Sequence, residues 1–178
     1  DLSLEWYFDE QSGLNAAIFW KDITNFITYE LEENVDIGVI GNIGGAGDAP
    51  VLYDVTRPIN GDSAEVLGFE VGAQHFFANG LGFRASYTYT DTEATVGGVD
   101  VGQLEGVSES AYSVALMYED ERWDIQLAAD YSGDYTVLND AVGGLSEIAE
   151  PITWITASVA YDLTDGITLS LEGRNLAD

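Results

Sequence analysis

Residues 123–131, which read WDIQLAADY, decide the fold of this 178-residue chain. Trp123, Ile125, Leu127 and Ala129 fall on every second position, and Asp, Gln, Ala and Asp stand between and after them. Successive side chains of a β-strand point to opposite faces, so a period of two marks a strand with one apolar and one polar side. The stretch therefore predicts a strand whose two faces meet different surroundings.

The same alternation recurs along the whole chain, at residues 2–8, 14–21, 67–74, 81–89, 111–118, 155–162 and 167–174. The connections alternate between short ones, at 9–13, 78–80, 119–121 and 164–166, and long loops, at 29–65, 91–109 and 136–151. Tight turns on one side and long loops on the other are typical of transmembrane barrels. The fold expected is all-β, an antiparallel up-and-down meander of about eight strands within such a barrel.

Formal charges within the expected strands are sorted by face. They all have the parity of the polar side: Glu5, Lys21, Glu70, Arg84, Asp124, Asp130, Asp162, Glu172 and Arg174. An Arg or Lys at the lipid midplane costs about 2–4 kcal/mol, so a lipid-facing surface requires this sorting. A soluble β-sandwich would require it too, with the apolar face turned inward. A soluble β-sandwich binding module therefore remains the alternative.

Strand length and aromatic placement favour the membrane. The expected strands run to about ten residues, longer than the roughly 5–6 of soluble sheets. Aromatic residues gather at the strand ends, and rings with one apolar and one polar end prefer the two membrane interfaces. One set flanks the short turns: Trp6, Phe8, Phe77, Phe83, Tyr118, Trp123 and Tyr161. The other flanks the long loops: Trp20, Tyr87, Tyr89, Tyr131 and Tyr135.

Composition excludes several classes of function. A net charge of -27 would repel a phosphate backbone, so nucleic-acid binding is not expected. The chain has no cysteine and one histidine, and it shows no nucleophile elbow, phosphate loop or paired metal ligands. We therefore expect no catalytic residue, no metal site, no cofactor and no enzyme activity. His75, on the apolar parity near a short turn, is interpreted as an interfacial residue.

Three segments carry a family resemblance: VTRPINGDSAEVLGFEVGAQHFFANGLGFRASYTYTDTEA from Val55, GVSESAYSVALMYEDERWDIQLAADYSGDY from Gly106, and ITWITASVAYDLTDGITLSLEGRNLAD from Ile152. Each motif is weak alone, but their order and spacing together resemble the TonB-dependent receptors, most closely the Caulobacter-type subgroup. The resemblance covers most of residues 23–178. Pro58, Asn60 and Gly61 match a loop-to-strand motif of the family and are interpreted as a turn.

The resemblance implies a barrel of about 22 strands in the bacterial outer membrane. Residues 1–178 would form a partial transmembrane domain from its C-terminal part, without the plug, the TonB-contacting segment or the final strand. The function implied is TonB-dependent nutrient uptake, of an oligosaccharide in preference to an iron-siderophore. The implied partners are outer-membrane lipid, the TonB complex through parts outside this chain, and the ligand. A complete small barrel of eight strands is the competing architecture.

Candidate site residues follow from position. Tyr29, Tyr53 and Asn60 lie in the first long loop, where aromatic and amide groups stack on and hydrogen-bond a sugar-like ligand. The same loop carries six acidic residues: Glu30, Glu32, Glu33, Asp36, Asp48 and Asp54. These form either a solvated acidic surface or a calcium site, although their spacing matches no ordered calcium loop. Lumen-facing charges are expected to pair with one another or contact a plug: Glu70, Arg84, Asp130, Glu172 and Arg174.

Overall fold

The computed structural model describes residues 1–41, 49–139 and 146–176, and every regular element in these ranges is a β-strand. None of these residues forms a helix long and apolar enough to cross a membrane. The strands are β1 (Leu2–Asp9), β2 (Ser12–Thr24), β3 (Ile27–Gly41), β4 (Ala49–Asn60), β5 (Ser63–Phe76), β6 (Leu81–Val96), β7 (Val99–Gly102), β8 (Ser110–Glu119), β9 (Trp123–Ser132), β10 (Tyr135–Asn139), β11 (Ser146–Ala149), β12 (Ile152–Thr164) and β13 (Ile167–Gly173).

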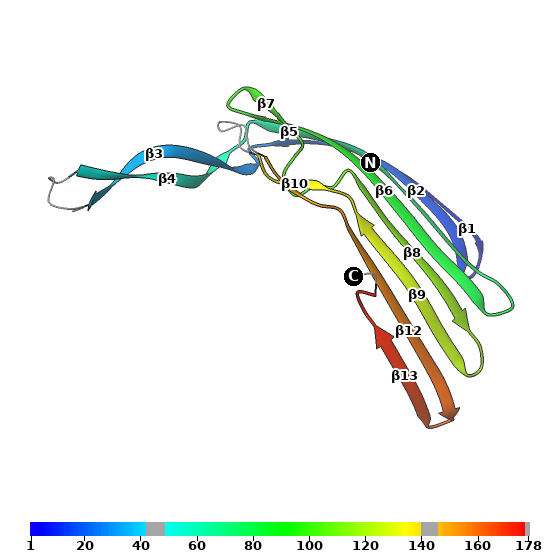
Figure 1. The fold of residues 1–178 in the computed structure, drawn as a ribbon. Coiled ribbons are helices and arrows are strands. Elements are labelled where there is room, and N and C mark those ends of the chain that lie inside the picture. Colours follow the sequence, from blue (N-terminus) through cyan, green and yellow to red (C-terminus); the bar gives the residue numbers. More distant parts are fainter. Residues whose placement is uncertain (42–48, 140–145, 177–178) are drawn as a thin grey trace.

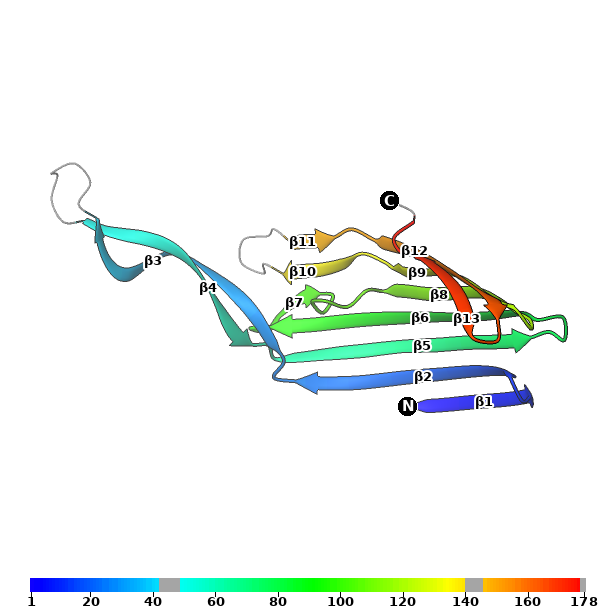
Figure 2. The ribbon, with the colours of Figure 1, turned by 90° about the horizontal axis from the view of Figure 1, so that it is seen from below.

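Eight of the strands form one curved wall in the order β1-β2-β5-β6-β8-β9-β12-β13 (Figure 1). Each neighbouring pair is antiparallel, and β7 is added to the outer part of β6. The two edges of the wall are β1, which is seen at one side in Figure 2, and β13, which is seen beside β12 in Figure 1. The predicted meander of eight wall strands is confirmed. Within the described residues β1 pairs only with β2 and β13 only with β12, so these residues do not form the competing closed barrel of eight strands.

Strand register confirms the predicted sorting of faces, because directly paired residues share a face. One row across the wall is apolar throughout and joins Trp6, Leu14, Ala73, Ala85, Val114, Ala129 and Ile155. The next row lies on the opposite face and joins Asn15, Gly72, Ser86, Ser113, Asp130 and Trp154. We call these two sides the apolar face and the polar face of the wall.

The apolar face is uncovered along its length. Leu4 on β1 is 72% exposed, Leu67 on β5 is 57% exposed and Leu127 on β9 is 48% exposed. Among the described residues, the buried apolar side chains are small and few, namely Ala64, Val66, Ala94, Ala115 and Ala128. A sheet needs a second layer to bury an apolar face from water, and the described residues supply none. The wall is therefore built for an apolar environment on this side.

The long connections differ from the expectation of loops. Most of the first is a two-stranded hairpin, β3–β4, that projects from the end of the wall (Figure 1). The third contains a second hairpin, β10–β11 (Figure 2). The period of two in fact continues through Ile27, Tyr29 and Leu31, with Thr28 and Glu30 between them. Pairing between β3 and β4 gives the backbone N–H and C=O groups of these residues hydrogen-bond partners beyond the end of the wall. Most of residues 29–65 therefore form paired strands, and their assignment to a loop was wrong.

Candidate functional site

The three long connections meet at one end of the wall, which we call the rim; the short turns lie at the other end (Figure 1). At the base of the β3–β4 hairpin, Gly61 N donates a hydrogen bond to Phe26 O at 2.7 Å. The Phe26 ring covers Gly61, leaving no room for a Cβ atom there. Asn25 has φ 57°, in the left-handed region that Asn tolerates better than most residues. The hairpin thus leaves the wall through a compact, defined bend.

The candidate ligand residues lie on this hairpin, but they do not all share a face. Tyr29 pairs with Pro58 and Asn60 pairs with Ile27, so alternation puts Tyr29 and Asn60 on the same side. Tyr53 pairs with Val35 and has the opposite parity to Asn60 along β4, so it faces the other side. Both tyrosines are exposed, at 49% and 40%. The structure brings Tyr29 and Asn60 together as neighbours on one face and separates them from Tyr53.

The acidic residues of the hairpin are partly engaged in its own structure. Glu32 forms an ion pair with Arg57, and the Asp54 carboxylate accepts a hydrogen bond from Asn34 N at 3.1 Å. Asp36 accepts one from Gly38 N at 2.9 Å. In the described parts of the chain, no three His, Asp or Glu side chains gather in a way that would hold a metal ion. Asp48 lies outside the described residues.

Four of the five charged residues predicted to face the lumen lie on wall strands, Glu70 on β5, Arg84 on β6, Asp130 on β9 and Glu172 on β13, and Arg174 directly follows β13. Glu172 and Arg174 form an ion pair, with 2.8 Å between Arg174 Nε and Glu172 Oε1, and both side chains are largely exposed. Glu70 pairs with Thr88 and Arg84 with Gln74, so those two charges stand in different rows. Asp130 lies between Ser113 and Trp154. Mutual pairing is therefore found for Glu172 and Arg174 and not for Glu70 with Arg84.

Arg84 borders a shallow groove of about 310 Å³ near the short-turn end of the polar face. Its polar lining includes Glu5, Asn15, Gln74 and Ser86. The groove carries both signs of charge and several amide and hydroxyl groups beside apolar lining from Leu14, Ala73 and Ala85.

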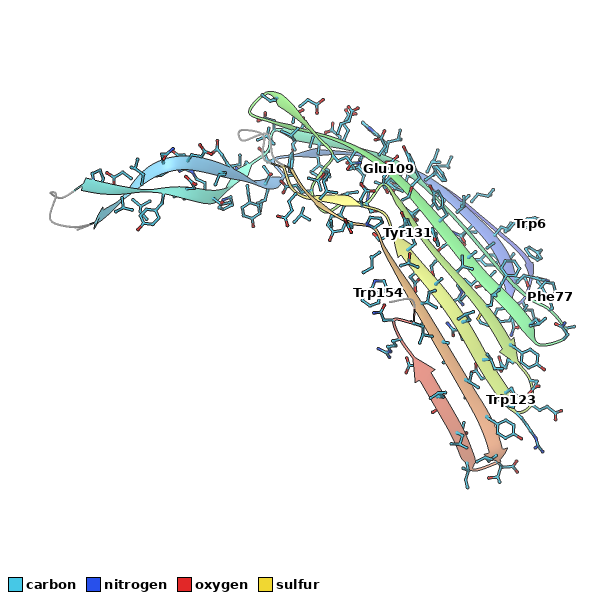
Figure 3. All side chains as sticks on the ribbon, viewed as in Figure 1. Trp6, Phe77, Glu109, Trp123, Tyr131 and Trp154 are labelled. Carbon is cyan, nitrogen blue, oxygen red and sulfur yellow. The ribbon has the colours of Figure 1, made fainter. Side chains whose placement is uncertain are left out.

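Aromatic side chains cluster on the apolar face close to the short turns. The His75 ring lies among three phenylalanines, with ring-centroid distances of 5.9 Å to Phe8, 4.3 Å to Phe77 and 6.4 Å to Phe83. His75 Nδ1 lies 2.8 Å from the hydroxyl of the buried Ser12. This position agrees with the interpretation of His75 as an interfacial residue. In Figure 3, Phe77 and Trp123 mark this end of the wall, and Glu109, Tyr131 and Trp154 lie toward the rim.

The short turn between β8 and β9 is organised by one carboxylate. Asp120 accepts hydrogen bonds from Arg122 N, Trp123 N and the Tyr118 hydroxyl, each at 2.8 Å. The Arg122 N–H makes the largest contribution to lowering the pKa of Asp120 below its ordinary value, followed by the Tyr118 hydroxyl and the Trp123 N–H. Trp123 in turn packs on Tyr161, with 4.5 Å between ring centroids.

Sequence reasoning did not single out Thr28, Thr92 or the segment 104–106, which are linked by hydrogen bonds at the rim. A threonine in a strand carries no special signal, because it suits a β-strand whether or not its hydroxyl is used. The one available signal was Gly106, the first residue of a motif quoted above, which has φ 76° and so marks a tight turn.

A curved antiparallel wall with one apolar and one polar face, tight turns at one end and long hairpins at the other, is the geometry of a segment of a membrane β-barrel. Residues 1–176 match the family described as TonB dependent receptor-like, beta-barrel, and the chain belongs to that family. No curated protein matches it in sequence.

Several solved structures share the fold. The copper transporter OprC is 18% identical with a TM-score of 0.66, and the match covers 98% of this chain and 24% of that one. The ferric-catecholate import receptor Fiu of E. coli is 19% identical with a TM-score of 0.65, covering 97% and 22%. The ferric enterobactin receptor PfeA of Pseudomonas aeruginosa is 18% identical with a TM-score of 0.60, covering 99% and 25%. The chain thus spans about a quarter of these proteins.

Proposed function

We propose that this chain is part of the barrel wall of a bacterial outer-membrane receptor that imports a scarce nutrient with energy supplied through TonB. The observation that carries the proposal is the unbroken apolar face over the eight wall strands, combined with membership of a family of such receptors. In this arrangement the apolar face contacts outer-membrane lipid, the polar face lines the lumen, and the rim faces the outside. The TonB complex would act through other parts of the receptor.

For the ligand we propose an uncharged oligosaccharide, bound at the rim with Tyr29 and Asn60 among the contacting residues. Exposed tyrosine rings stack on sugar faces, and an amide both donates to and accepts from hydroxyl groups. The β3–β4 hairpin carries Glu30, Glu33 and Asp36 beside one paired arginine. This negative surface repels anions, which disfavours an anionic ferric chelate.

A ferric chelate or copper is the second candidate. The relatives with solved structures carry names that refer to copper, ferric catecholate or ferric enterobactin, and none of those names refers to a sugar. That observation favours a metal-related ligand, while the charge of the hairpin favours a neutral one.

Binding to the full-length protein in detergent separates the candidates. Oligosaccharides of different linkage, a ferric catecholate and copper ions would be titrated against the wild type, Tyr29→Ala and, as a matched control on the other side of the hairpin, Tyr53→Ala. We expect an oligosaccharide to bind and Tyr29→Ala to weaken it by about tenfold, with a smaller effect of Tyr53→Ala. Binding of the ferric catecholate or copper, without any sugar, would overturn the ligand assignment. Uptake that continues in cells lacking TonB would overturn the transport mechanism.

A further inference from the structure

Three consecutive residues at the rim each bond to a different part of the structure. Leu104 N donates to Thr92 Oγ1 on β6 at 3.0 Å. The Glu105 carboxylate accepts from the Thr28 hydroxyl on β3 at 3.1 Å. Gly106 N donates to Thr136 O on β10 at 2.8 Å. We call Leu104, Glu105 and Gly106 the rim junction, because they connect the wall with both hairpins.

Two of the side chains that the rim junction contacts are shielded from water. Thr28 is 4% exposed and Thr92 is 6% exposed, which makes them two of the three buried polar side chains in the described residues. A buried hydroxyl or carbonyl that loses its partner is left without a replacement from solvent, so such bonds hold more firmly than exposed ones. The third buried polar residue, Ser12, lies at the other end of the wall.

The geometry points to a coupling role: we propose that the rim junction makes the β3–β4 and β10–β11 hairpins move as one unit, with Glu105 as the positioning residue for Tyr29. Thr28 directly precedes Tyr29 on β3, so the bond to Glu105 sets where the tyrosine stands relative to the wall. The two hairpins form separate sheets and are not paired with each other. The segment 104–106 bonds to both hairpins and therefore provides a route for coupling between them.

The relevance of this coupling to ligand binding rests on the proposed function, but the coupling itself does not. Loss of the bond between Thr28 and Glu105 makes the segment 104–106 more mobile. The bond between Gly106 N and Thr136 O is weakened as a result. A ligand that orders the β3–β4 hairpin would, by the same route, order β10–β11.

Hydrogen exchange of the full-length protein, followed peptide by peptide, tests the inference. In Thr28→Val the hydroxyl is lost at nearly constant volume, and we expect exchange to become about tenfold faster in both hairpins. Thr92→Val should loosen the β3–β4 hairpin as well, although Thr92 lies on β6. Thr28→Ser, which keeps the hydroxyl, and Thr56→Val, at an exposed threonine of β4, should leave exchange in β10–β11 at the wild-type rate.

Faster exchange confined to β3–β4 in Thr28→Val would overturn the coupling. If Thr92→Val disrupts the wall itself, Glu105→Ala replaces it, and unchanged exchange in β10–β11 there would also overturn the inference. The two hypotheses fail separately. Coupled exchange without any sugar binding would contradict the proposed ligand but not the coupling. Sugar binding with uncoupled exchange would contradict the coupling but not the proposed ligand.

Discussion

The Phe19 ring on β2 covers Gly68, its directly paired residue on β5, so closely that residue 68 has no room for a Cβ atom. Both lie on the polar face of the wall. Phe76 covers Gly82 in the same way at the other end of that face. A glycine in a strand loses more conformational entropy than other residues and offers no side chain for packing, and an aromatic ring across the strand compensates for the missing contact. These pairs fix the register of neighbouring wall strands.

Gly68→Ala should destabilise the wall. The added methyl group would meet both the Phe19 ring and the backbone carbonyl of Tyr89, and the carbonyl cannot move without breaking the pairing of β5 with β6. We expect a loss of about 1–3 kcal/mol, measured as a lower midpoint in urea unfolding of the protein in detergent. Gly166→Ala is the matched control, because nothing lies within 4 Å of a Cβ there. Equal midpoints for the two variants would contradict the proposed packing.

Leu127→Arg and Gln126→Arg place the same side chain on opposite faces of β9. Leu127 pairs with Leu116 and Ala157 on the apolar face, and Gln126 pairs with Met117 and Ser158 on the polar face. An arginine in lipid costs about 2–4 kcal/mol, so Leu127→Arg should block assembly, scored as loss of the heat-modifiable band. Gln126→Arg should assemble normally. Equal yields of assembled protein would show that the faces have been assigned wrongly.

Asp120 should make the β8–β9 turn sensitive to acid. Its pKa in the folded protein is lowered by the hydrogen bonds it accepts, so the carboxylate stabilises the turn fully above the pKa of about 3.9 of an unfolded Asp. This stabilisation is lost as the pH falls through the lower folded value. The protection factor of the Trp123 amide, the ratio of the exchange rate of an unstructured peptide to its own rate at the same pH, should therefore fall in acid more in the wild type than in Asp120→Ala. Glu121→Gln, in the same turn, should behave like the wild type.

The wall was predictable from the sequence because its two faces differ in polarity, which gives every strand a period of two. Trp123 to Tyr131 is the plainest example, and its register matches the expected faces. The β3–β4 hairpin was missed although its first residues keep a period of two, because the acidic residues and glycines that follow them are typical of a loop. The rim junction was not predictable, since it depends on bonds between residues up to 77 positions apart.

The sequence placed Tyr29 and Asn60 in the same long connection, but it did not predict that they share a face. Their common face follows from the register of β3 with β4, which no local pattern reveals. Tyr53 is separated because it lies an odd number of positions from Asn60 along β4, so alternation turns it to the other side.

The central claim is that the apolar face of this wall contacts lipid in the outer membrane. The most direct measurement is fractionation of cells that express the full-length protein, followed by electrophoresis of heated and unheated samples. We predict a heat-modifiable band in detergent-extracted outer membranes. Recovery of the folded protein in the soluble fraction, with no such band, would contradict the claim, because the apolar face would then have to be covered by protein.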